Sequence, residues 1–118
     1  AATAYKILSM DQKEAHEKYE IRSVAYNGEN LFLATKQGEI VSLRPNLQLN
    51  AKLKFPFAHF LGLVTKDDKV YILEKEGYLI VAPKDLSSYT VHSVSLDEGF
   101  VFVTEKGFFV NDELISIE

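Results

Sequence analysis

One pattern of apolar and polar residues occurs three times along the chain. Each copy has a run of four mainly apolar residues, a polar trio that contains lysine, a glycine, and then a second apolar run. The copies begin at residues 31, 70 and 100, and their glycines lie at positions 38, 77 and 107. Such a repeat predicts the architecture before any single residue is considered, because each copy forms one supersecondary unit.

The first repeat predicts antiparallel strands joined by tight turns. Its apolar runs favour strands because they are rich in β-branched and aromatic residues. Asn27-Gly28 is a strong hairpin signal, since both residues accept a positive φ angle. Gly38 predicts the next turn for the same reason. The predicted strands of this repeat are residues 21–26, 31–35, 39–43 and 47–53, the last with the period-two alternation of a half-buried strand.

The second and third repeats predict further strands of the same kind. The predicted strands are residues 60–65, 70–73, 78–82 and a short outer strand beginning at 89–91, then 91–96, the two runs around Gly107, and 114–117. The second interval between the repeated glycines is shorter than the first. This difference predicts a missing or very short outer strand between the second and third repeats.

The segment before the first repeat has a different composition. Residues 11–20 are good helix formers with almost no apolar stripe, which predicts a charged surface loop or a short helix after the strand-like residues 5–10. We expect the N-terminal segment and the three repeats to form a single domain. Its parts are an N-terminal strand and connector at 1–20, and repeats at 21–53, 54–90 and 91–118.

The strand, Thr-Lys-x-Gly turn, strand pattern is clearest at residues 33–38. It resembles the blades of β-propellers of the WD-repeat-like or citron-homology type, and the resemblance covers residues 21–118. It implies an all-β fold of repeated antiparallel meanders, about three blades in number. Propellers usually have about four to eight blades. The resemblance therefore implies either part of a larger propeller or copies of the chain that join to complete a ring.

Composition narrows the possible functions. The 118 residues correspond to one domain or a fragment of a larger protein, and 47% hydrophobic residues favour a packed globular fold. A net charge of −4 argues against nucleic acid as a partner, because binding the phosphate backbone needs a basic face. The chain has no cysteine, which excludes disulfides, thiolate catalysis and cysteine-based zinc sites.

The sequence contains no evident membrane or targeting segment. No apolar run reaches the roughly 18 residues of a membrane-spanning helix, and no signal peptide is visible. The chain begins at Ala1 rather than Met, which indicates processing or excision. A cytoplasmic location is favoured, with a cleaved leader as the open alternative.

The titratable residues predict no catalytic, cofactor or metal site. His16, His59 and His92 occur in three different contexts, which is typical of ordinary surface or core-edge histidines. The acidic pairs at 67–68, 97–98 and 112–113 fall at predicted turns, where solvated turn tips are favoured over a calcium site.

Three phenylalanines surround a proline between the first and second repeats. If exposed, Phe55, Phe57 and Phe60 would form a hot spot for a partner. If buried, they would pack between neighbouring blades, and burial is the favoured alternative.

Lysines recur near the repeated turn, at Lys36, Lys75 and Lys106. Equivalent turns of a propeller align on one face, so these lysines are a candidate basic ring for an anionic partner. Ordinary exposed turn lysines are the favoured alternative, given their acidic neighbours.

These observations predict a non-catalytic protein–protein interaction or scaffold module. We expect a protein partner or self-association, with no nucleic acid and no membrane span. The alternative is a ligand-binding or enzymatic propeller whose site is completed by a partner chain or by missing blades.

Overall fold

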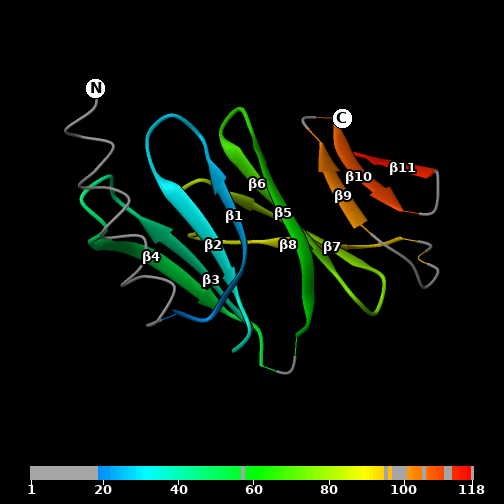
Figure 1. Ribbon diagram of the computed structural model, residues 1–118, viewed down its shortest axis with the longest axis horizontal. Helices are drawn as coiled ribbons and strands as arrows, with labels where there is room; N and C mark the ends of the chain where they lie inside the picture. The colour runs from blue at the N-terminus through cyan, green and yellow to red at the C-terminus, as the bar shows by residue number, and fades with distance from the viewer. Residues whose placement is uncertain are drawn as a thin grey trace.

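Three antiparallel sheets follow one another along the chain in the computed structural model (Figure 1). The structure describes residues 19–56, 58–94, 96, 101–104, 106–110 and 113–117. The first sheet contains β1 (Ile21–Tyr26), β2 (Leu31–Thr35), β3 (Glu39–Leu43) and β4 (Leu49–Lys54). The second contains β5 (Phe60–Lys66), β6 (Lys69–Glu74), β7 (Tyr78–Pro83) and β8 (Thr90–Ser93). The third contains β9 (Val101–Thr104), β10 (Gly107–Val110) and β11 (Glu113–Ser116). The predicted all-β fold of repeated, blade-like meanders is confirmed.

The repeated glycines are needed at their turns for two physical reasons. Gly38 and Gly77 have φ angles of 83° and 95°, in the region that favours glycine. Each carbonyl also accepts a hydrogen bond from the residue after the outer strand, Phe55 N at 2.7 Å and Val94 N at 2.8 Å. A Cβ atom at either glycine would lie against the carbonyl oxygen of that same residue. The repeat visible in the sequence is therefore a turn that holds the end of the outer strand.

The structure corrects the start of the first outer strand. The strand predicted from residue 47 begins at Leu49. Leu47 has a φ angle of 64°, and its amide donates a 2.7 Å hydrogen bond to the carbonyl of Arg44. The strand prediction was therefore wrong for residues 47 and 48, because the chain is still turning there after β3.

The structure also corrects residues 91–96, which were predicted to open the third repeat. Thr90–Ser93 forms β8 and pairs with β7, from Val81↔Thr90 to Tyr78↔Ser93. The reason is that β7 leaves an edge open, and a turn at 84–87 returns the chain to it. The outer strand of the second sheet is thus present but short, with four residues against six in β4. After the outer strand β4 of the first sheet, the chain forms β5 before the repeated hairpin of β6 and β7. Among the described residues, no corresponding strand lies between β8 and β9.

The sheets pack face to face through apolar clusters. Between the first and second sheets, Phe32 and Ile40 meet Phe60 and Ile72, each at most 1% exposed. Between the second and third sheets, Leu73 packs with Phe108, Val110 and Ile117. A third cluster, made of Leu31, Leu33, Val41 and Leu43, lies on the other face of the first sheet.

A glycine on β5 sets the distance between the second and third sheets. A Cβ atom at Gly62 would lie 2.8 Å from Val103 Cγ2 and 3.1 Å from Phe108 Cε1. Side-chain contacts closer than about 3.5 Å are repulsive for carbon atoms. Gly62 therefore allows β9 and β10 to approach β5 closely.

Several predicted features lie outside the described residues. They are the strand-like residues 5–10, most of the segment 11–20, His16, Phe57, and the turns at 97–98 and 111–112. Within the described residues, no helix is long and apolar enough to span a membrane.

Candidate partner-binding site

The connector between β4 and β5 holds the aromatic residues that the sequence singled out. Phe55 is fixed at its backbone by the bond to Gly38, and Ala58 N donates a 3.1 Å hydrogen bond to the Phe55 carbonyl across Pro56. The Phe55 ring packs edge-on against Phe60, with centroids 6.3 Å apart, and against Tyr89, with centroids 4.9 Å apart. The connector is thus attached to the core on one side and to the segment before β8 on the other.

The phenylalanines do not form one exposed cluster. Phe60 is 1% exposed and belongs to the core between the first two sheets. Phe55 is half-buried. Phe57 lies outside the described residues. Of the two phenylalanines that the structure describes here, Phe55 lies at a surface pocket.

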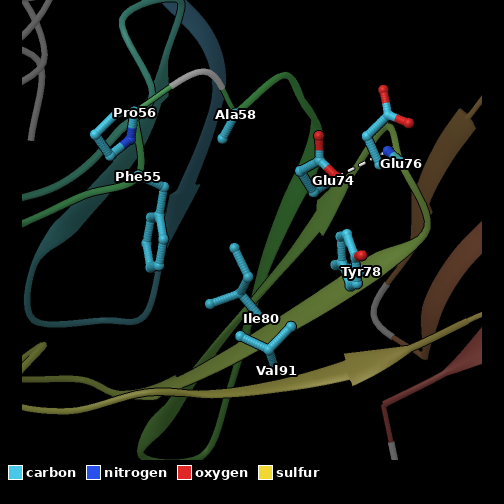
Figure 2. A pocket seen from close by; sticks show the side chains of 8 residues that line it. All are labelled: Phe55, Pro56, Ala58, Glu74, Glu76, Tyr78, Ile80 and Val91. Atoms are coloured by element: carbon cyan, nitrogen blue, oxygen red, sulfur yellow. Dashed lines mark hydrogen bonds between the residues drawn. The ribbon is translucent and has the colours of Figure 1, made fainter.

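That pocket has a volume of ≈ 250 Å³ and lies between the connector, the β6–β7 turn and the outer strands of the second sheet (Figure 2). Figure 2 shows Phe55 on one side and Tyr78 on the other, with Ile80 and Val91 between them and Glu74 near the turn. The lining residues are Phe55, Pro56, Ala58, Glu74, Glu76, Tyr78, Ile80 and Val91.

Large apolar side chains at this pocket or next to it remain exposed. Tyr78 is 46% exposed, Tyr89 50% and Val91 49%. The β7–β8 register places Val91 opposite Ile80 and Tyr78 opposite Ser93, which fixes their backbone positions. Tyr89 joins this group through its contact with Phe55. We call the aromatic residues Phe55, Tyr78 and Tyr89, together with the neighbouring aliphatic residue Val91, the aromatic rim.

Of the two carboxylates that line the pocket, Glu74 is buried and Glu76 is exposed. Glu74 is 6% exposed, and its carboxylate accepts hydrogen bonds from two backbone amides, Glu76 N at 2.7 Å and His59 N at 3.3 Å. These bonds tie the β6–β7 turn to the connector. The first of them is drawn in Figure 2.

The surroundings of His59 favour its neutral form. Burial lowers the pKa of His59 below its ordinary value of 6.5, and the positive charges of Arg22 and Lys75 lower this pKa further. The negative charge of Glu74 opposes these effects. Arg22, at the start of β1, was not a candidate from the sequence, because only the packing of the sheets brings it near His59.

The three candidate lysines are all exposed and lie on three separate turns. Lys36 and Lys75 occupy equivalent positions: their amides donate to the carbonyls of Glu20 and His59, the residues before β1 and β5. Lys106 is displaced by one residue, since it directly precedes Gly107. A basic ring formed by these lysines stays a prediction.

The other titratable groups suggest no metal site in the part of the chain that the structure describes. No group of three His, Asp or Glu side chains among these residues could hold a metal ion. His92 instead contacts Thr90, with Nε2 3.3 Å from Oγ1. Asp68, one of the predicted turn acids, lies 3.5 Å from Lys84.

The sequence reasoning missed most of the aromatic rim. Tyr78, Tyr89 and Val91 were considered only as strand residues. A signal was available at Tyr89 and Val91, which place two large side chains two residues apart on a predicted outer strand. Their convergence with Phe55 follows from the pairing of β8 with β7. The sequence had predicted that an outer strand begins at 89–91, but had assigned residues 91–96 to the third repeat.

Comparison with known proteins gives two sequence relatives and several solved structures of similar fold. No family model matches the chain. The chain is 31% identical over 115 residues to the plasminogen-binding protein PgbB of one Helicobacter pylori strain, and 30% identical to that of a second strain. The match covers 92% of this chain and 21% of each relative, so the chain spans about a fifth of their length.

One of these solved structures indicates the class of fold. The crystal structure of BamB from Moraxella catarrhalis, a β-propeller protein, matches with a TM-score of 0.56 at 10% sequence identity. The match covers 75% of this chain and 29% of that protein. The chain therefore has the fold of a stretch of propeller-like sheets.

Proposed function

We propose that this chain is a non-catalytic protein-binding module whose three sheets act as successive blades of a propeller. The observation that carries the proposal is the aromatic rim around the pocket of the second sheet. Folded proteins rarely leave large apolar side chains exposed together unless they contact a partner. Tyrosine and other large side chains beside a pocket are also the usual hot spots of protein interfaces.

The fold supports this role because it presents the rim rigidly. Tyr78 and Val91 stand on paired strands, and Phe55 is held by its hydrogen bond to Gly38. A surface that is already ordered loses less conformational entropy on binding, so more of the contact energy appears as affinity.

The relatives suggest which partner to test first. Both are named as plasminogen-binding proteins, and the match to them extends over most of this chain. We therefore propose plasminogen as the candidate partner, bound through the aromatic rim.

The test is binding of the purified chain to immobilised plasminogen, measured by surface plasmon resonance. Val91→Asp places a charge in the rim, and we expect it to weaken binding by about tenfold or more, the typical effect at a hot spot. Leu49→Asp is the matched control, because Leu49 is also aliphatic, lies on the outer strand β4 and is 51% exposed. If both variants bind with the same affinity as the unmodified chain, the aromatic rim is not part of the interface. Absence of binding by the unmodified chain would refute plasminogen as the partner.

A further inference from the structure

In the first and third repeats a neutral residue stands where the second repeat has Glu74. Thr35 and Thr104 hold this position, three residues before the repeated glycine. The Thr104 hydroxyl accepts a 3.2 Å hydrogen bond from the amide two residues on, as the Glu74 carboxylate does, whereas the Thr35 hydroxyl accepts a 3.1 Å bond from the amide four residues on. The Glu74 carboxylate also accepts a bond from His59 N, so it supplies a second acceptor and a negative charge that threonine does not.

Glu74 places a negative charge at a mostly buried position beside the pocket. The residue is 6% exposed, and its two hydrogen-bond donors are uncharged backbone amides. None of the ion pairs of the described residues includes Glu74. The two amides stabilise the carboxylate but leave its net charge unbalanced, so a cation that reached it would add a favourable interaction.

The pocket beside Glu74 has the shape and lining for a cation on an apolar stem. Phe55 and Tyr78 provide walls, and Ile80 and Val91 lie between them, as Figure 2 shows. An apolar stem would contact these side chains while its charged end reached the Glu74 carboxylate. The five heavy atoms of a butylammonium group, at about 30 Å³ each, need about 150 Å³. The pocket volume of ≈ 250 Å³ is large enough for this group.

The hydrogen bonds of Glu74 favour lysine over arginine as the source of that cation. Oε1 accepts from His59 N and Oε2 accepts from Glu76 N. A guanidinium binds best when both carboxylate oxygens are free for its planar pair of donors. An ammonium ion needs only one remaining lone pair and can approach from the pocket side.

We propose that this pocket receives a lysine side chain of the protein partner, with the stem on the aromatic rim and the ammonium on Glu74. The inference rests on the proposed protein-binding function and names the chemistry that the partner must present. Glu76 lies at the pocket as a second carboxylate, but it is exposed, so solvent screens its charge.

The test is a heteronuclear NMR titration of the chain with Nα-acetyl-lysine amide. We expect saturable shifts confined to the pocket residues, with a Kd on the order of 1 mM. Nα-acetyl-norleucine amide has the same stem without the charge, and we expect it to bind at least fivefold more weakly. Equal binding of these two probes would overturn the proposal. Tighter binding of Nα-acetyl-arginine amide would overturn the assignment to lysine.

The variant that removes the charge is Glu74→Thr, which places at residue 74 the amino acid found at the equivalent position of the other two repeats. We expect a folded chain with at least fivefold weaker lysine binding, and a smaller loss in Glu76→Gln. If Glu74→Thr does not fold, Glu74→Gln removes the charge while keeping the side-chain length. Unchanged lysine binding in either folded variant would overturn the proposal.

The outcomes separate this inference from the proposed function. If plasminogen binding depends on Val91 but the lysine probe does not bind, only the lysine pocket is refuted. If the lysine probe binds through Glu74 but the chain binds no plasminogen, only the proposed partner is refuted.

Discussion

Two glycines with the same backbone conformation provide a direct test of how the repeated turn works. Gly28 and Gly77 both have a φ angle of 95°. A Cβ atom at Gly28 would have nothing within 4 Å, whereas a Cβ atom at Gly77 would lie 2.8 Å from the carbonyl oxygen of Val94. Alanine at each position therefore introduces the same backbone strain, but only Gly77→Ala adds a steric conflict.

The expected magnitudes follow from these contacts. An L-residue with positive φ costs about 1–2 kcal/mol, partly offset by about 0.4–1 kcal/mol of lost freedom in the unfolded chain. We therefore expect Gly28→Ala to lower the free energy of unfolding by about 1 kcal/mol. In Gly77→Ala the end of the outer strand must move away, which disrupts the 2.8 Å bond from Val94 N to the Gly77 carbonyl. This loss adds about 1–2 kcal/mol.

The assay is urea unfolding followed by far-UV circular dichroism, since the chain has no tryptophan. At a slope of about 1–3 kcal/mol per molar urea, this difference of about 1–2 kcal/mol should separate the midpoints of the two variants by roughly 0.3–2 M. Equal slopes are required, because a changed slope would indicate a changed denatured state or an intermediate. Equal midpoints would refute the explanation that the glycine is kept for its close approach to the outer strand.

Four further predictions concern packing and charge. Gly62→Ala should lower the free energy of unfolding by about 1–3 kcal/mol through overpacking, and adding Val103→Ala should recover part of that loss; purely additive losses in urea unfolding would contradict this contact. Phe60→Ala should cost about 3–5 kcal/mol, measured in the same way, and a much smaller cost would contradict its place in the core. Because burial and neighbouring cations lower the pKa of His59, its contribution to stability is present above pH 6.5 and is lost as the pH falls through the lowered pKa. Unfolding measured from pH 7.5 to 5 should thus show a weaker pH dependence in His59→Gln, and an unchanged dependence would count against the prediction. Lys84→Met should remove two exposed ion pairs and slightly lower the free energy of unfolding. This decrease should disappear in 1 M salt, which screens the charges. A decrease that persists in 1 M salt would indicate a packing role instead.

Much of the fold could be predicted from the sequence because its signals are local. The strands β1 to β3 match their predicted residues, since Asn27-Gly28 and Gly38 mark the turns between them. Errors arose where local patterns were ambiguous. Leu47 continues an alternating pattern while the backbone turns, and residues 91–96 have strand propensity without indicating which sheet they join.

The candidate site was less predictable because it depends on contacts between distant segments. The sequence drew attention to Phe55, and the structure places it at a pocket. Tyr78 and Val91 reach the same pocket only through the pairing of β7 with β8. Glu74 stood out in the sequence only as one of the acidic neighbours of the candidate lysines, and its burial results from the connector folding over it.

The sequence by itself determined the repeated turn, since a positive φ and a missing Cβ are requirements of single glycine positions. It also determined which strands are adjacent, because short turns join neighbours. The tertiary structure decided which side chains are exposed together and which charge is buried. Those properties depend on how sheets pack on one another, and the free energy of such packing is shared among residues far apart in the chain.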